Sequence, residues 1–198
     1  MRRWWPRVNR RSRLLLGLAS MTFTGAIALP GLPTAAVQLS DGSTAFTSPP
    51  RLADFVTFDN FIYERNPTYY VTVNLLPEAG EPLQTLTVRL IEGRFTRLNF
   101  RTERLAVFAG GRRDRGTEYA IAATEYNDDD QTLTIQLAEP ASPGQQLTFA
   151  LELVRNPRFS GVYLYEVTAA PAGDQPRFQR VGTGRIHIYD RGRDPFWP

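Results

Sequence analysis

The chain has 198 residues, a formal net charge of +3 at pH 7, one histidine and no cysteine. With no cysteine and a single histidine, the composition argues against a zinc site of the usual kind and against a Cys-His or Ser-His-Asp nucleophile. All 23 basic residues are arginine, which excludes a P-loop lysine, a Schiff-base lysine and a Ser-Lys dyad.

The first 36 residues have the pattern of an export signal. Six arginines precede an apolar run at 14–29, and two prolines break that run ahead of the small residues at 34–36. The run has 16 residues, fewer than the roughly 20 of a spanning helix, which favours a cleaved signal helix over a retained anchor. Arg13 stands where a twin-arginine signal carries an apolar residue, so we predict export of residues 37–198 by the general secretory route.

Cleavage after Ala36 changes the charge of the protein. The signal carries 6 of the 23 arginines and none of the 20 acidic residues, which leaves 17 basic against 20 acidic groups, a net charge of −3. This balance argues against nucleic-acid binding. A lipoprotein anchor would need a cysteine. We therefore expect no spanning helix after cleavage and no cofactor, and we identify no metal-binding or catalytic residue.

Alternation of apolar and polar residues predicts strands through most of the remaining chain. Inward faces are expected at Tyr69, Val71, Val73 and Leu75, at Leu133, Ile135 and Leu137, and at Leu147, Phe149, Leu151 and Leu153. Large side chains on both faces of Val162–Ala169 predict a central strand covered on both sides. About eight to ten short strands separated by Gly, Pro, Asn and Asp turns indicate an all-β fold.

The predicted architecture is an antiparallel two-sheet β-sandwich of immunoglobulin-like type, with a closed barrel as the alternative. It comprises a signal peptide at 1–36, a sandwich domain at 37–190 and a coil tail at 191–198. Two Arg-Asn-Pro motifs, at 65–67 and 155–157, each precede an aromatic strand. We interpret them as a shared turn type and not as an internal duplication.

The groups able to do chemistry are few. Alternation turns His187 outward, beside Arg185 and Tyr189, as a surface histidine of a strand. A glycosidase needs two facing carboxylates, and Glu78 and Glu81 are close in sequence but lie in a Pro/Gly turn that is expected to be solvated. The acidic segment Asn127–Asp130 matches no calcium loop and is predicted to be a hairpin turn, with a calcium site as the open alternative.

One loop offers a candidate contact surface. Gly110–Gly116 carries Arg112, Arg113 and Arg115, and guanidinium groups grip carboxylates, sulfates and phosphates with two parallel hydrogen bonds. The outward Tyr70 has an aromatic face on which a sugar ring can stack. These four residues are the candidate contacts for an acidic polysaccharide, for lipid headgroups or for an envelope protein; the alternative is a solvated loop in which Asp114 pairs with a neighbour.

Four segments together resemble the secreted cyanobacterial family known as domain of unknown function 2808. They are Ala36-Val37-Gln38-Leu39-Ser40-Asp41-Gly42 with Pro49-Pro50-Arg51-Leu52, Tyr69 to Leu83, Val154-Arg155-Asn156-Pro157-Arg158-Phe159 with Gly161-Val162-Tyr163-Leu164, and Gly184 to Gly192. The resemblance implies export across a cyanobacterial inner membrane and a shared fold. It brings no activity, cofactor or catalytic residue.

These observations favour an exported, non-enzymatic β-sandwich of the cell envelope that acts as an interaction or structural module. A polysaccharide-binding module is the alternative, and a two-carboxylate glycosidase is a third reading. The expected location is the periplasm or the cell exterior, and the export signal equally fits the thylakoid lumen.

Overall fold

The computed structural model describes residues 42–94 and 97–192. The predicted signal peptide at 1–36 lies outside the described residues, as does the tail from residue 193 onward. No helix in the described ranges has the length and apolar character needed to cross a bilayer. The strands are β1 (Arg51–Thr57), β2 (Thr68–Leu75), β3 (Leu83–Glu92), β4 (Ala106–Ala109), β5 (Glu118–Tyr119), β6 (Ile121–Asn127), β7 (Thr132–Ala141), β8 (Gln145–Glu152), β9 (Gly161–Pro171) and β10 (Gln179–Ile188), with 3₁₀ turns η1 (Pro77–Ala79) and η2 (Thr102–Arg104).

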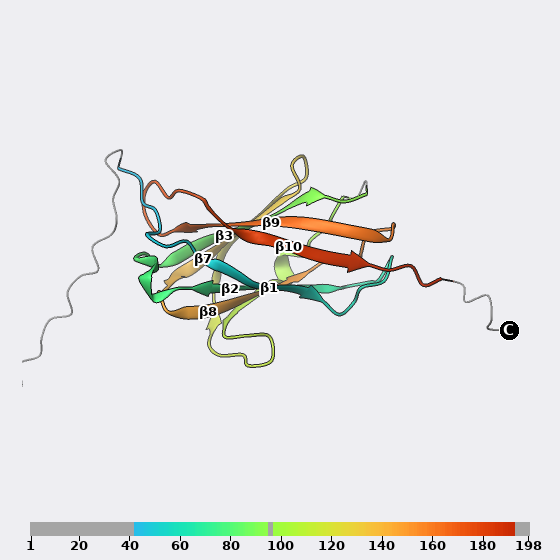
Figure 1. Cartoon of the computed structure of the whole chain (residues 1–198), viewed down its shortest axis with the longest axis horizontal. Helices are drawn as coiled ribbons and strands as arrows, with labels where there is room; N and C mark the ends of the chain where they lie inside the picture. Colours follow the sequence, from blue (N-terminus) through green and yellow to red (C-terminus); the bar gives the residue numbers. More distant parts are fainter. Residues whose placement is uncertain (1–41, 95–96, 193–198) are drawn as a thin grey trace, which may run out of the picture. The chain divides into compact units, whose positions relative to one another are not determined.

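The strands form two five-stranded sheets, in the orders β1-β2-β8-β4-β5 and β10-β9-β3-β7-β6. Every pair of neighbouring strands is antiparallel. Figure 1 shows the second sheet, with β9 and β10, above β1, β2 and β8 of the first sheet. The predicted all-β antiparallel two-sheet sandwich is confirmed, and the closed barrel is not adopted.

The inner faces of the two sheets form one apolar core. The predicted inward residues of β2, β7 and β8 are all buried, because a strand with period-two alternation turns its apolar set toward the opposite sheet. Phe55 and Tyr165 stack with ring centroids 5.0 Å apart, and Tyr69 meets Tyr165 edge-on at 6.0 Å. Burial raises the pKa of the Tyr69 and Tyr165 hydroxyls above the ordinary value of 10.0.

The sandwich is tightly joined where β10 lies beside β1. Gly184 on β10 faces Phe55 on β1, and a Cβ atom at this glycine would overlap the phenylalanine ring. The missing side chain is therefore what lets the aromatic ring reach the core at this edge.

The prediction that β9 is covered on both faces is wrong. Tyr163, Tyr165 and Val167 are buried on the inner face, but Val162 is 36% exposed and Leu164 is half-buried on the other. β9 is central in its sheet because β10 and β3 pair with its two edges. Hydrogen-bonded edges do not cover a face, and the outer face carries polar groups such as Glu166, which pairs with Arg89 at 2.6 Å.

Candidate functional site

The arginine-rich loop between β4 and β5 folds back over the outer face of the first sheet. The Gly110 amide donates to the Gln146 carbonyl (2.7 Å), and the Thr148 hydroxyl donates to the Gly110 carbonyl (2.7 Å), so both hydrogen bonds hold the loop on β8. Gly110 has φ +85°, and a Cβ atom there would overlap the Asp114 carbonyl oxygen. A glycine at the start of the loop is therefore required for the loop to close.

Beneath this loop lies a small apolar layer that is separate from the main core. Phe108 pairs with Thr148 and shares its outward face, yet it is fully buried. The Arg115 guanidinium lies over the Phe108 ring at 4.6 Å, and the Thr148 hydroxyl lies 3.0 Å from that of Thr72. The loop thus contacts the sheet through Gly110, Arg112 and Arg115, while residues 113–117 stay exposed to solvent.

The structure places two of the three predicted arginines on aromatic rings of this face, and one of these rings is the predicted Tyr70. The Arg112 guanidinium lies 4.2 Å from the centroid of the Phe58 ring and 5.9 Å from that of Tyr70. Arg115 covers Phe108, whereas Arg113 is exposed and has no such contact in the described part of the chain. We call the surface formed by Phe58, Tyr70, Arg112, Arg113 and Arg115 the outer-face patch.

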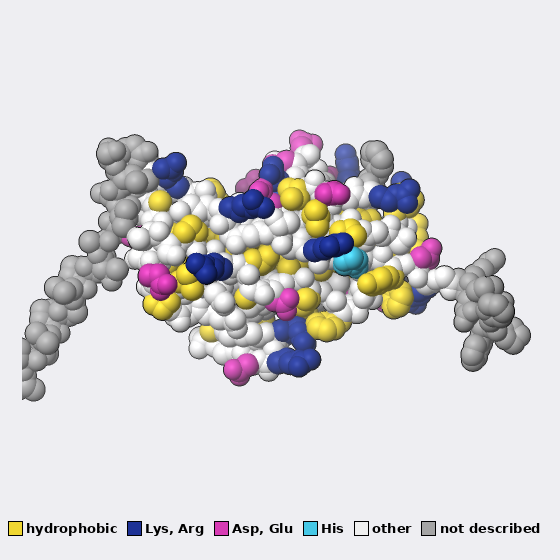
Figure 2. Space-filling model, viewed as in Figure 1, with side chains coloured by type: hydrophobic (Ala, Val, Ile, Leu, Met, Phe, Trp, Pro, Cys, Tyr) yellow, Lys and Arg dark blue, Asp and Glu magenta, His cyan; other side chains and the backbone are white. Residues whose placement is uncertain are grey.

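Phe58 was not among the predicted contacts, although it is 60% exposed and directly follows β1. It reaches the patch because Val56 on β1 pairs with Tyr70 on β2. Arginine–aromatic packing recurs on this protein: the described residues hold six such contacts, made by five arginines. Figure 2 shows arginine and hydrophobic side chains gathered around the single histidine, near the end of β10.

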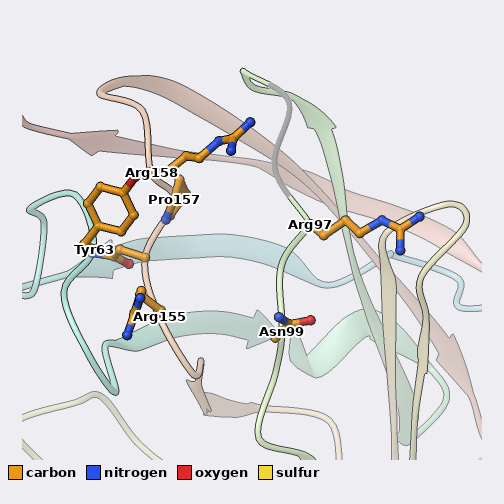
Figure 3. A pocket seen from close by; sticks show the side chains of 7 residues that line it. Tyr63, Arg97, Asn99, Arg155, Pro157 and Arg158 are labelled. Carbon is orange, nitrogen blue, oxygen red and sulfur yellow. The ribbon is translucent and has the colours of Figure 1, made fainter.

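A second candidate lies at the end of the sandwich where β10 ends. Here a cavity of about 400 Å³ is lined by Tyr63, Arg97, Asn99, Arg155, Asn156, Pro157 and Arg158. We call it the end pocket. In Figure 3 one wall is the segment 155–158 and the facing wall is the segment 97–99, with Tyr63 beside the first.

The two Arg-Asn-Pro motifs build this pocket by pairing with each other. Arg65 and Arg155 form an antiparallel bridge, with the Asn66 amide donating to Val154 (3.2 Å) and the Asn156 amide donating to Glu64 (2.9 Å). Their interpretation as one turn type is wrong, because Asn66 has φ +54° and Asn156 does not adopt a positive φ. The motifs are partners across two segments that lie 90 residues apart.

Asn156 is the buried anchor of the pocket. Its side-chain amide donates to the carbonyls of Asp59 and Phe61 (2.9 Å to Phe61) and accepts from the Tyr69 hydroxyl (2.9 Å). These bonds fix the segment that leads to Tyr63, whose backbone has φ +57°. A left-handed conformation is a true outlier for a bulky aromatic residue, and such outliers concentrate at functional sites.

The pocket is positively charged. None of its lining residues is acidic, and within residues 42–94 and 97–192 neither Arg155 nor Arg158 pairs with a carboxylate. Arg97 differs: its guanidinium lies 3.3 Å from Asp128, and Figure 3 shows it pointing away from Arg155. The nearby Glu64 carboxylate is paired with Arg191.

The other sequence candidates have structural surroundings of their own. Glu81 is buried, so the prediction that Glu78 and Glu81 are both solvated is wrong for Glu81. The oxygens of Asn127–Asp130 close the predicted hairpin turn, since those of Asn127 and Asp130 accept from backbone amides. His187 points outward as predicted and stacks on Tyr189 at 6.2 Å. No cluster of three or more His, Asp or Glu residues suited to a metal occurs in the described ranges.

Two carboxylates do share a cavity elsewhere. A cavity of about 480 Å³ at the β5 edge of the sandwich is lined by Glu118 of β5 and Glu139 of β7, together with Tyr119 and Gln145. Tyr119 donates its hydroxyl to the Gln145 side chain (2.6 Å). Both glutamates are exposed. Sequence reasoning missed this pair because its members belong to different sheets.

The family model described as protein of unknown function (DUF2808) matches residues 43–188, and the chain belongs to this family. No curated protein matches the sequence. Among solved structures, the chain is similar to the collagen-binding domain of a Staphylococcus aureus adhesin (5% identity, TM-score 0.39, covering 68% of this chain and 96% of that one). It is also similar to domains D2 and D3 of the major pilin SpaD from Corynebacterium diphtheriae (15%, 0.43, 68% and 51%) and to BslA, a bacterial hydrophobin (13%, 0.41, 73% and 97%).

Proposed function

We propose that this DUF2808 protein is an exported, non-catalytic binding module of the cell envelope that holds acidic polysaccharide on its outer-face patch. The observation that carries the proposal is the position of Arg112 on the rings of Phe58 and Tyr70. It places a cation and two aromatic faces within one contact surface.

The chemistry of this surface fits an anionic sugar chain. Aromatic faces offer apolar area to the C–H faces of a pyranose ring at little cost in side-chain entropy. Guanidinium groups bind carboxylates and sulfates with paired, charge-assisted hydrogen bonds. A ring stacked on Phe58, which is 60% exposed, would bring its acidic substituent toward Arg112 and Arg113. Packing on aromatic rings also holds Arg112 and Arg115 in place before a ligand arrives.

The proposed location of the protein rests on the export signal at residues 1–36. Its basic segment, short apolar run and small-residue cleavage site favour export to the periplasm or beyond, with the thylakoid lumen as the alternative. The resemblance of the sequence motifs favours a cyanobacterial envelope. The partner is then an acidic polysaccharide of that envelope, or an envelope protein that presents a similar anionic surface.

A two-carboxylate glycosidase is the second candidate, favoured by the shared cavity of Glu118 and Glu139. The binding module is preferred because both glutamates are exposed, whereas a glutamate that acts as a general acid is usually shielded from water by burial.

The test is affinity electrophoresis of the protein purified after export, in gels that contain polygalacturonate or neutral dextran. We expect retardation by polygalacturonate alone, weakened by salt. Arg112→Gln with Arg115→Gln should weaken retardation about tenfold, whereas Arg51→Gln with Arg177→Gln removes the same charge from exposed sites elsewhere and should change it little.

Equal retardation by dextran, or equal loss in both double variants, would contradict the proposal. Because Arg115 covers Phe108, thermal unfolding of each variant is measured alongside. Arg113→Gln serves as a further variant, since this exposed side chain has no packing role. Its loss should weaken retardation without moving the unfolding midpoint.

A further inference from the structure

We infer that the end pocket is a separate binding site for one anionic pyranose residue, a sugar ring that carries a carboxylate or a sulfate. The site goes beyond the outer-face patch, and the inference holds whether or not that patch binds a polymer. It is carried by three observations: the charge of the pocket, its volume, and the backbone conformation of Tyr63.

The charge selects an anion. Arg155 and Arg158 line the cavity and lack a carboxylate partner in the described part of the chain, and the acidic groups nearby are already engaged. Glu64 pairs with Arg191, and Asp128 pairs with Arg97 on the far side of the wall. No carboxylate in the described part of the chain therefore competes with an anion for these two guanidinium groups, although that of Arg158 also packs over the Phe159 ring, 4.7 Å from its centroid.

The volume selects a ligand larger than a simple anion. A cavity of about 400 Å³ lies in the range of small-molecule sites, roughly 300–1,000 Å³. It has room for about a dozen water molecules at roughly 30 Å³ each, which is enough to admit a substituted pyranose ring and well above the volume of a sulfate or a carboxylate. The Asn99 side chain can serve hydroxyl groups of such a ring as donor and acceptor.

Tyr63 supplies the sugar-facing wall together with Pro157. The Tyr63 amide donates to the Pro157 carbonyl (3.3 Å), so the two residues are held side by side, as Figure 3 shows. The tyrosine is 53% exposed and has φ +57°, although neither the core nor a hydrogen bond of its side chain requires an aromatic residue there. An exposed aromatic ring kept in a strained conformation beside two arginines is explained by a role in binding.

The pocket is also built before any ligand arrives. Asn156 bonds the carbonyls of Asp59 and Phe61 from a buried position, and the Arg65–Arg155 bridge ties the segment 155–158 to the segment that carries Tyr63. A preformed wall reduces the ordering entropy that a small ligand must offset. Affinity for a single sugar residue can then be measurable even though few contacts form.

The test is amide NMR of the protein purified after export, titrated with four probes: glucuronate, glucose 6-sulfate, glucose and inorganic sulfate. We expect saturable shifts at Tyr63 and at Arg155–Arg158 with one or both anionic sugars. The stronger of the two identifies the acidic group. Glucose and inorganic sulfate should bind at least about tenfold more weakly, since each lacks one half of the recognised chemistry.

Arg155→Gln and Arg158→Gln should each weaken the binding of the anionic sugar about tenfold, and Arg177→Gln is the matched control at the far end of β10. Unchanged shifts at residues distant from the pocket show that the variants are folded. The inference is overturned if the anionic sugars shift no pocket signal, if inorganic sulfate binds as well as they do, or if Arg177→Gln weakens binding equally.

The outcomes also separate the two sites. Shifts confined to residues 110–117 would support the outer-face patch and refute the end pocket. Ligand-induced shifts at Tyr63 that persist in Arg112→Gln would support the end pocket independently of binding at the outer-face patch.

Discussion

The outer-face patch and the end pocket present the same residue types on surfaces of different shape. In the patch, Arg112 and Arg115 lie on aromatic rings, and the loop that carries them is hydrogen-bonded to the sheet. In the end pocket, Arg155 and Arg158 line an open cavity of about 400 Å³. The first arrangement offers a flat contact surface, which suits a polymer, and the second offers a concave site, which suits a single residue.

The comparison also shows how each surface is held. The patch is held by a glycine-flanked loop that is hydrogen-bonded to the neighbouring strand β8. A buried side chain, Asn156, and a bridge between segments 90 residues apart hold the pocket. Changes at these supports should therefore damage one surface and spare the other.

The largest effect is expected from Asn156→Ala. Removing this side chain leaves the carbonyls of Asp59 and Phe61 and the Tyr69 hydroxyl without their partner, which should lower the free energy of unfolding by about 3 kcal/mol. Urea unfolding measures the loss. Binding at the outer-face patch should persist in the folded fraction.

Asn66→Ala is the matched control, because Asn66 holds the same position in the other Arg-Asn-Pro motif but is exposed. It should lower the free energy of unfolding by only about 1 kcal/mol, since alanine is disfavoured at φ +54°. Equal losses in the two variants would show that the motifs are equivalent, against the asymmetry described above.

The next effect is expected from Gly110→Ala, which attacks the support of the patch. Positive φ and overlap with the Asp114 carbonyl together should cost at least about 2 kcal/mol, by chemical denaturation. Gly42→Ala shares the positive φ (+81°) but meets no atom within 4 Å, so about 1 kcal/mol is expected there. Retained retardation by polygalacturonate in Gly110→Ala would mean that the loop geometry is irrelevant to binding.

A loss of folding stability that grows with pH is expected from two tyrosines, Tyr69 and Tyr126. Burial raises the pKa of Tyr69, and burial with the Asp128 charge raises that of Tyr126 to about 12. The unfolded tyrosines lose their protons first, so stability is complete below about pH 10 and falls above it, by up to about 1.4 kcal/mol per pH unit for the buried Tyr69 and by less for the partly exposed Tyr126. Unfolding free energies at pH 9 and 11 measure the slope.

Tyr69→Phe tests the assignment, since it removes the tyrosine that bonds Asn156. Its slope between pH 10 and 11 should be shallower than that of the unaltered protein. An unchanged slope would show that Tyr69 ionises as freely in the folded protein as in the unfolded chain.

The smallest effect concerns the strain at Tyr63. Tyr63→Gly should be more stable than Tyr63→Ala by about 1 kcal/mol, because glycine adopts φ +57° without penalty. Both variants should lose the anionic sugar at the end pocket. A Tyr63→Gly variant that still binds with full affinity would assign the tyrosine no part in the pocket.

The sequence predicts the patch better than the pocket, and the reason is physical. Period-two alternation reports which residues of β2, β7 and β8 face the core, since that choice depends only on the strand itself. Three arginines within one loop are visible as a local cluster. Arg155 and Arg158 line the end pocket only because residue 65 pairs with residue 155. No local sequence pattern predicts that pairing.

The repeated Arg-Asn-Pro motif is the one local pattern in the sequence that marks the pocket. Its interpretation as a shared turn type is wrong. Pairing gives Asn156 a buried position and Asn66 an exposed one, so identical residues take different roles. The misjudged face of β9 has the same origin, because apolar side chains on a strand do not reveal whether another layer covers them.

The central claim is that the protein binds acidic polysaccharide without cleaving it. The most direct test measures binding and cleavage on one sample. The protein purified after export is incubated with polygalacturonate, and polymer-bound protein and newly formed reducing ends are quantified together. The account predicts salt-sensitive binding and no increase in reducing ends. New reducing ends that disappear in Glu118→Gln or Glu139→Gln would contradict it and assign the protein to the glycosidases.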